Sequence, residues 1–239
     1  MNKITLLFLS LFCGQLFAQN SQCTTNPDYL KAEYKITQSA APKQDKKMIL
    51  WRSKEQVAHE FSKITELWQH VRNGQIRPIR YFEDAKRGIE YQPAELKKDQ
   101  NWDSKYQLMS EAFLQQMEVV GEQGFGCDKV QLRTFKKADY QVQLEWYPAL
   151  KLVKSARLKN QHNTTQIELI NKNTNLKEIK QQFAAWDRYQ TTDYADIGDN
   201  EADPFLRKMI NLGFIEHGAT GFYHEDGHAL GGGHHNHGH

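Results

Sequence analysis

The stretch YQVQLEWY, residues 140–147, alternates apolar and polar side chains without a break. Successive side chains of a β-strand point to opposite faces of a sheet, so this alternation predicts one buried face and one face in solvent. The residues expected on the buried face are Tyr140, Val142, Leu144 and Trp146. A strand with two such different faces is typical of antiparallel sheets.

Further segments with strand character flank this one. VQLRTF at 130–135 and TQIELI at 165–170 are its expected neighbours. Asn73 and Gly74 both tolerate the positive φ of a tight hairpin turn, and they lie within a run of short strand patterns. Those patterns are EYKIT (33–37), MILWRS (48–53), QVAHEF (56–61), TELWQHV (65–71), QIRPIRYF (75–82) and GIEYQ (88–92). The first half of the chain is therefore expected to form an antiparallel meander.

Three segments carry helical patterns. The first helix is expected over 102–120, where the apolar stripe comprises Trp102, Tyr106, Met109, Phe113 and Val120. The second is expected after Asn175 as N-cap, with Glu178 as its capping-box partner. The third is expected after Asp203 as N-cap, with Gly213 as its stop. The order of strands, helix, strands and helices predicts an α+β fold, a curved antiparallel sheet with packed helices.

Two stretches resemble known groups of proteins. LEWYPALKLVKSARLKN, residues 144–160, is a strand that breaks at Pro148 and resumes. It resembles the second-half hairpin of the periplasmic lipoprotein carriers and related half-barrel proteins, and the resemblance covers topology over residues 30–170. RYFEDAKRGIEYQPAEL, residues 80–96, resembles an element of uncharacterised secreted bacterial proteins. The first resemblance implies a curved sheet, and the second implies no activity.

The beginning of the chain has the features of a secretory signal. Lys3 precedes an apolar run over residues 4–12, and Ala18 stands before polar Gln19. We expect residues 1–18 to be a signal peptide and the protein to be periplasmic or secreted. No later segment approaches the roughly 20 apolar residues that a membrane span requires, so no transmembrane segment is expected.

Two cysteines remain after the signal peptide, Cys23 and Cys127. In an oxidising compartment such a pair predicts a disulfide. A Cys/His metal site or a nucleophilic thiol is the alternative, but no second thiol or local motif lies near either residue. A disulfide here would tie the mature N-terminus to the middle of the fold.

Composition limits both size and partners. The chain has 239 residues, 39% hydrophobic and 25% charged, with a formal net charge of +2. This length favours a single α+β domain over residues 19–215. Basic and acidic residues are intermixed rather than collected into one block, so we expect no nucleic-acid partner.

The end of the chain is rich in histidine and glycine. We expect residues 216–239 to form a disordered tail, because this segment offers little apolar surface to bury. Neutral imidazoles at this density bind zinc, copper or nickel with little selectivity. The candidate metal ligands are His224, His228, His234, His235, His237 and His239.

HEDGHALGGGH, residues 224–234, also matches the HExxHxxGxxH signature of the metzincin metalloproteases. That resemblance implies zinc on His224, His228 and His234, with Glu225 as the general base. In this sequence, however, three glycines follow Leu230, and the chain ends before a Met-turn. We interpret the match as a chelating tail, with a zinc metallopeptidase as the alternative.

An acidic cluster precedes the third helix. The oxygen ligands of Asp193, Asp196, Asp199 and Glu201 could collect calcium, although their spacing is not that of an EF-hand. The alternative is a loop whose last aspartate caps the following helix.

Together these features predict a secreted or periplasmic, non-enzymatic binding or accessory protein with a metal-binding histidine tail. Its expected partners are a metal ion and an apolar ligand or protein. Zinc metallopeptidase and calcium-binding interaction module remain the alternatives.

Overall fold

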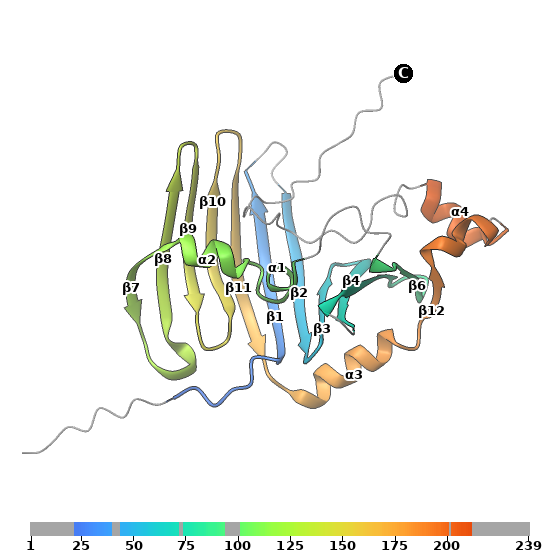
Figure 1. The fold of residues 1–239 in the computed structure, drawn as a ribbon, viewed down its shortest axis with the longest axis horizontal. Helices are drawn as coiled ribbons and strands as arrows, with labels where there is room; N and C mark the ends of the chain where they lie inside the picture. Colours follow the sequence, from blue (N-terminus) through green and yellow to red (C-terminus); the bar gives the residue numbers. More distant parts are fainter. Residues whose placement is uncertain (1–21, 40–43, 72–73, 94–100, 201, 212–239) are drawn as a thin grey trace, which may run out of the picture.

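The computed structural model describes residues 22–39, 44–71, 74–93, 101–200 and 202–211. Its strands join into one twelve-stranded sheet (Figure 1). They are β1 Tyr29–Gln38, β2 Gln44–Ser53, β3 Gln56–Glu60, β4 Ile64–His70, β5 Ile76–Phe82, β6 Arg87–Glu90, β7 Glu118–Gln123, β8 Val130–Lys137, β9 Tyr140–Tyr147, β10 Leu152–Lys159, β11 Thr164–Asn173 and β12 Gln190–Asp193. The helices are α1 Trp102–Gln107, α2 Glu111–Gln116, α3 Leu176–Trp186 and α4 Pro204–Asn211. The 3₁₀ segments include η3 Gly126–Asp128 and η4 Tyr194–Asn200.

Two meanders make up the sheet. The strand order is β12-β6-β5-β4-β3-β2-β1-β11-β10-β9-β8-β7. Each pair is antiparallel except β12 with β6, which is parallel. The predicted curved antiparallel sheet is therefore confirmed, and it is unclosed, because β7 and β12 lie at opposite edges.

Irregular pairing contributes to the curvature. The register shifts at Glu33/Tyr34 on β1, at Val119/Gly121 on β7 and at Val153/Ser155 on β10. A β-bulge bends its strand and increases the local twist. The sheet therefore bends: β7–β11 and β1–β2 stand side by side in Figure 1, whereas β3–β6 turn away from them.

The helices cover opposite faces of this sheet. Leu50 belongs to the apolar cluster beneath α1 and α2, whereas the next residue, Trp51, belongs to the cluster beneath α3. Consecutive strand residues point to opposite faces, so α1–α2 and α3 lie on different sides. We call the side covered by α1 and α2 the inner face and the other side the outer face.

The helix predicted over 102–120 is wrong in its extent. Leu108 is left-handed, with a φ of 64°, and ends α1. Ser110 then starts α2 as its N-cap, accepting from the Phe113 backbone N–H at 3.1 Å. Val120 of the predicted stripe is 58% exposed on edge strand β7. A local cap and a left-handed residue thus divide one apolar periodicity into two short helices and a strand.

Helix α3 begins as predicted. The side chain of Asn175 accepts from the backbone N–H groups of Lys177 and Glu178 at 3.1 and 3.2 Å. The reciprocal half of the capping box does not form, because the Glu178 carboxylate instead accepts from Asn173 at 2.6 Å and Lys31 at 3.0 Å. These contacts fasten the start of α3 to β1 and β11.

Helix α4 also begins as predicted, and the segment beyond it lies outside the described residues. The carboxylate of Asp203 accepts from the Phe205 backbone N–H at 2.8 Å and from Arg87 at 2.9 Å. Phe205 packs edge-on against Phe82, so α4 closes a small apolar cluster over β5 and β6. The predicted stop at Gly213 and the tail 216–239 fall in the undescribed part.

The disulfide between Cys23 and Cys127 is confirmed, with a Cα–Cα distance of 4.5 Å. It links the segment before β1 to the connection between β7 and β8. Both cysteines pack against the inner-face cluster. The bridge therefore ties together the two meanders next to the segment that carries α1 and α2.

Candidate functional site

The candidate site lies on the inner face, where α1 packs against β2, β3 and β4. It combines an apolar floor with buried polar groups, and its central side chains come from four strands and one helix. We call the following group the inner polar cluster: Arg52, His59, Glu66, Trp68, Arg80 and Lys105.

Arg52 on β2 holds α1 in place on the inner face. We call α1 and α2 together the cover of this face. Its guanidinium is fully buried and donates to the Tyr106 carbonyl at 2.7 Å, the Leu150 carbonyl at 2.8 Å and the Lys151 carbonyl at 2.6 Å. It also lies over the Tyr106 ring, 4.1 Å from the centroid. The planar fork of an arginine suits several carbonyls at once. Arg52 therefore joins the end of α1 to the β9–β10 turn.

His59 on β3 makes a second link to α1. Its Nε2 lies 2.8 Å from the Lys105 carbonyl oxygen. A carbonyl only accepts, so Nε2 carries the proton in this contact. Burial is the main cause that lowers the pKa of His59 to about 3, and the neighbouring charges of Lys105 and Arg52 lower it further. The imidazole is therefore neutral at physiological pH and acts as a neutral donor.

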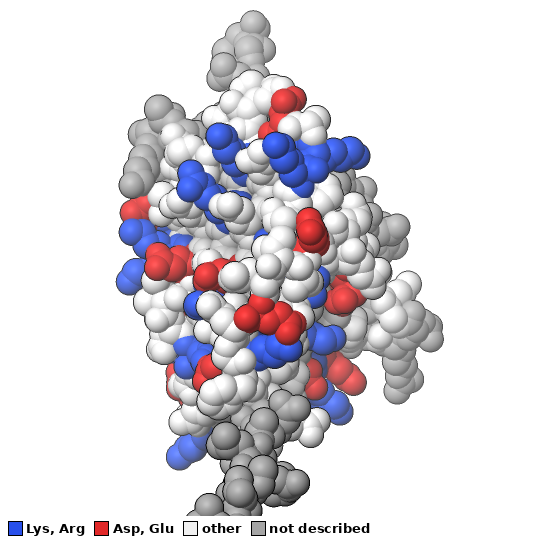
Figure 2. All heavy atoms as spheres, turned by 90° about the vertical axis from the view of Figure 1, so that its left-hand side faces the viewer, with Lys and Arg blue, Asp and Glu red and all other residues white. Residues whose placement is uncertain are grey.

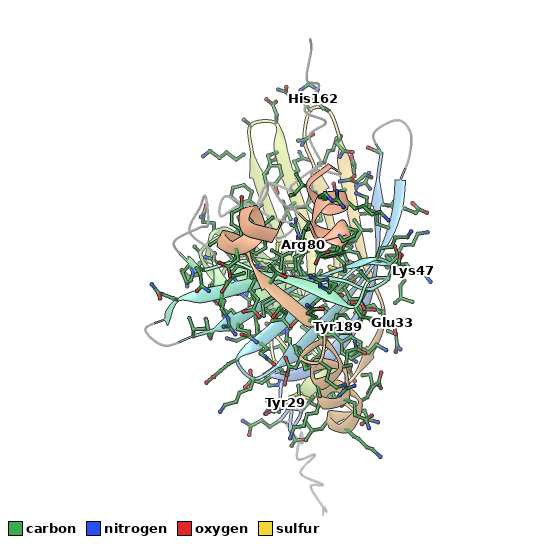
Figure 3. The ribbon with its side chains drawn as sticks, turned by 90° about the vertical axis from the view of Figure 1, so that its right-hand side faces the viewer. Tyr29, Glu33, Lys47, Arg80, His162 and Tyr189 are labelled. Atoms are coloured by element: carbon green, nitrogen blue, oxygen red, sulfur yellow. A yellow bond between two sulfur atoms is a disulfide. The ribbon has the colours of Figure 1, made fainter. Side chains whose placement is uncertain are left out.

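Glu66 on β4 and Arg80 on β5 form a buried ion pair. The Arg80 Nη2 lies 2.5 Å from a Glu66 carboxylate oxygen, and both side chains are about nine-tenths buried. Burial raises the pKa of Glu66, while Arg80 opposes that rise. In Figure 3 Arg80 lies well inside the outline of the molecule, whereas His162 marks its upper tip. The pair brings one charge of each sign into the interior.

Lys105 on α1 adds a further positive charge. The residue is only 5% exposed, and its ammonium lies 4.9 Å from the centroid of the Trp68 ring. Burial lowers the pKa of Lys105 to about 8, and the attraction of Glu66 only partly offsets this. Trp68 itself is fully buried, and within the described part of the chain its indole N–H has no hydrogen-bond partner.

The apolar part of the inner face adjoins this cluster. The residues that α2 and the junction between α1 and α2 contribute to it are Leu108, Met109, Phe113, Leu114 and Met117. They pack on strand residues that include Met48, Leu50, Val142 and Leu144. The inner face is thus amphipathic, with charged groups around Lys105 and apolar groups under α2.

The outer face of β7–β11 carries an open hollow of about 730 Å³. The side chains on this face come from two cross-strand rows that alternate with core residues. One row is Thr134, Gln143, Arg157 and Gln166, and the other is Leu132, Glu145, Ser155 and Glu168. Glu145 already accepts from Ser155 at 3.1 Å and pairs with Lys154 at 3.2 Å. The lining of the hollow mixes these charged and polar side chains with the apolar side chains of Val120 and Leu132.

The β7 side of the molecule shows charges of both signs (Figure 2). Acidic and basic side chains are intermixed over its middle, and basic side chains gather near its upper end. One sign of charge therefore does not dominate this face.

The predicted metal ligands lie outside the described residues. This applies to Glu225 and to His224, His228, His234, His235, His237 and His239. Metal binding by the tail and the metallopeptidase alternative therefore stay predictions. Within the ranges that the structure describes, no group of three or more His, Cys, Asp or Glu side chains is placed to hold a metal ion.

The predicted calcium cluster is described only in part. Asp193 ends β12 and accepts from Gln92 at 3.0 Å, and Asp196 lies in η4. The side chain of Asp199 and the whole of Glu201 lie outside the described residues. Calcium binding stays a prediction.

Sequence reasoning did not identify the inner polar cluster. The alternation in TELWQHV could have indicated this cluster, because it places Glu66, Trp68 and His70 on one face of a strand. A carboxylate, an indole and an imidazole sharing one face with buried neighbours indicate a polar interior. Lys105 gave no such signal, because its burial depends on how α1 packs on β3.

None of the helices among the described residues combines the length and apolar character that crossing a membrane requires.

Comparisons with known proteins find similarity only at the level of overall shape. No family model and no curated protein matches the chain. An uncharacterised conserved protein from Thermus thermophilus is 9% identical, with a TM-score of 0.40 over 70% of this chain and 91% of that one. A DUF1329 family protein from Desulfovibrio piger is 8% identical, with a TM-score of 0.34 over 64% of this chain and 87% of that one.

A third similar structure is the Pseudomonas aeruginosa MucA/MucB complex. The matched chain is 12% identical, with a TM-score of 0.33 over 62% of this chain and 53% of that one. These identities and scores are too low to assign a family or an activity.

Proposed function

We propose that the protein is a non-enzymatic binding protein that holds an apolar ligand on the inner face of its sheet, beneath α1 and α2. The observation that carries this proposal is the nature of the cover. Two six-residue helices, joined through left-handed Leu108, lie over a continuous apolar surface and are fastened by Arg52.

Such a cover is suited to displacement. A six-residue helix has few internal hydrogen bonds and is marginal on its own, so its stability comes from packing. The strands below it keep their own ladder hydrogen bonds whether or not the helices lie on them. Opening of the cover therefore requires the loss of local contacts rather than the unfolding of the sheet.

The side chains of the cover also match an apolar ligand. Met109, Phe113 and Met117 fill the space that acyl or other apolar groups would occupy after displacement. Methionine is unbranched and flexible, which lets the same surface repack around different shapes. A ligand that replaces these side chains would keep the inner face dry.

The compartment is part of the proposal. The disulfide supports an oxidising environment, because such bonds persist mainly outside the cytoplasm. We place the protein in the periplasm or among secreted proteins, with residues 1–18 as its signal peptide and 19–215 as its single domain. The histidines of the tail support an additional role in binding zinc, copper or nickel.

Binding of dodecanol to protein with and without the hydrogen bonds of Arg52 tests the proposed function. Arg52→Met removes the hydrogen bonds that fasten α1 and leaves an apolar side chain in their place. Arg188→Met, at an exposed site after α3, is the matched control. Because the closed cover competes with the ligand, weakening it should raise the affinity several-fold. Calorimetry should show binding by the natural protein and R188M, and tighter binding by R52M.

Circular dichroism would establish that the sheet survives in each variant. Absence of dodecanol binding in the folded natural protein and in folded R52M would reject the proposed function.

A further inference from the structure

The charged part of the inner face restricts which apolar ligand fits. Lys105 lies on α1, and Leu108 and Met109 follow it at the junction with α2. Charged and apolar groups thus belong to one continuous cover. A ligand bound beneath this cover would meet both kinds of surface.

The charges of the inner polar cluster differ in how they are compensated. Arg80 has the Glu66 carboxylate at 2.5 Å, and Arg52 has three carbonyl oxygens within 2.8 Å. The ammonium of Lys105 has a different environment. Within the described chain its interactions are the face of Trp68 and the attraction of Glu66, whose carboxylate is already engaged. Lys105 is therefore the buried cation with the weakest compensation in this cluster.

Trp68 adds a second donor at the same place. Its ring carries the Lys105 ammonium on one face, and its buried N–H has no acceptor among the described residues. Leaving a buried donor unsatisfied lowers stability, and leaving a buried charge uncompensated lowers it more. Two adjacent donors of this kind fit one group of acceptor oxygens.

We propose that Lys105 and Trp68 bind the anionic head group, a carboxylate or a phosphate, of an amphiphile whose chain lies on the apolar inner face. This inference rests on the proposed function and deepens it by naming the ligand class. The ammonium supplies a charge-assisted hydrogen bond, the stronger kind in a buried site. The indole N–H supplies a neutral one. The chain replaces the apolar contacts of α2, so Lys105 on α1 stays beside Trp68.

A series of ligands with one chain and different head groups tests the head-group site. Calorimetry would compare dodecanoate, dodecyl phosphate, dodecanol and dodecyltrimethylammonium, all below their micelle concentrations, together with inorganic phosphate. The natural protein should bind the two anionic amphiphiles roughly tenfold or more tightly than dodecanol, and the cationic one most weakly. Inorganic phosphate should bind far more weakly than dodecyl phosphate.

Two variants assign the preference to the two donors. Lys105→Met keeps an unbranched side chain of similar length and removes its charge, so the preference for anionic over neutral amphiphiles should disappear. Trp68→Phe keeps an aromatic ring and removes the N–H, so the preference should shrink but remain. Lys177→Met, at an exposed position of α3, is the control and should leave every affinity unchanged.

The outcomes separate this inference from the proposed function. Binding of dodecanol without any anionic preference, or a preference that survives in K105M, overturns the inference and leaves the proposed function standing. Equal affinity for inorganic phosphate and dodecyl phosphate also overturns it, because the chain would then contribute nothing. Failure to bind any of the amphiphiles rejects the proposed function itself.

Discussion

The indole groups on the two faces of the sheet are hydrogen-bonded to different degrees. On the outer face, the indole N–H of Trp51 donates to Glu60 at 2.7 Å and that of Trp186 donates to Glu83 at 2.9 Å. On the inner face, the indole of Trp68 has no acceptor among the described residues. The layer beneath α3 thus has its indole groups paired, whereas the layer beneath α1 retains an indole donor without an acceptor in the described chain.

This contrast is expected if the layer beneath α3 serves stability and the inner face serves the proposed binding. Beneath α3, Glu83 also accepts from Tyr189 at 2.7 Å and Thr65 at 2.6 Å, so one carboxylate serves several donors. Beneath α1, the Lys105 ammonium is buried against an aromatic face. Functional sites commonly retain groups that reduce stability, because their partner arrives with the ligand. The following predictions test that division.

The largest effect is expected from truncation in the α3 layer. Trp186 is fully buried and contacts Trp51, Tyr81 and Phe183. Trp186→Ala should therefore reduce the free energy of unfolding by about 3–5 kcal/mol, measured by urea denaturation. Dodecanol affinity in the remaining folded protein should not change. A large loss of affinity without a loss of stability would contradict the division between the faces.

Reduction of the disulfide should have the next largest effect. The bridge spans 104 residues, and removing it should cost about 2–4 kcal/mol because the unfolded chain gains freedom. The melting temperature of the Cys23→Ser, Cys127→Ser double variant should fall accordingly. Thiol titration of the freshly isolated natural protein checks the bond itself. Two titratable thiols in native protein would be inconsistent with it.

Lys105→Met should raise stability, in the opposite direction from the first two changes. Burial lowers the pKa of Lys105 from its ordinary 10.5 to about 8 in the folded chain. The folded state then binds fewer protons than the unfolded state between these values, so the natural protein gains stability as pH rises from 8 to 10.5. K105M should be about 3 kcal/mol more stable at pH 7, and this advantage should shrink by about pH 10.

Thermal unfolding of K105M and the natural protein across this pH range measures the difference. The inner polar cluster also contains His59, Glu66 and Arg80, which are present in both proteins, so their titration largely cancels from the comparison. A constant difference in stability between the two proteins across the range would show that burial does not lower the pKa of Lys105 in the folded state.

The smallest effect on stability is expected from the histidine tail. Deletion of residues 223–239 should change the melting temperature of metal-free protein by an amount equivalent to less than about 0.5 kcal/mol, because little apolar surface is lost. Zinc or copper binding, measured by calorimetry, should mostly disappear. Zinc-loaded natural protein should show no peptidase activity that depends on Glu225. Cleavage abolished by both Glu225→Gln and a chelator would favour the metallopeptidase.

Most of the sheet could be predicted from local patterns, because alternation identifies strands and tight turns identify hairpins. The stripe from Trp102 to Val120 misled because helical periodicity does not register a left-handed residue such as Leu108. The short strands β7 and β12 carry weak patterns and exist by pairing with β8 and β6. Such tertiary pairing is not encoded in a single segment.

The site was harder to predict than the fold. The cysteine pair followed from counting and compartment, and the structure confirms it. The environment of Lys105 depends on contacts of α1 with β3 and β4, which lie more than thirty residues earlier in the chain. The sequence instead drew attention to histidines and aspartates whose side chains are mostly outside the described residues. Their metal chemistry therefore remains predicted from composition alone.

The position of β1 in the sheet has a consequence for how the chain acquires its structure. β1 pairs with β2, which follows it at once, and with β11, which is made last of the large strands. Contacts such as Ser39 with Asn163 join residues 124 positions apart. Non-local pairing of this kind slows folding. A chain emerging from a ribosome or a translocon would keep one edge of β1 unpaired until β11 arrives, and premature folding would be disfavoured until then.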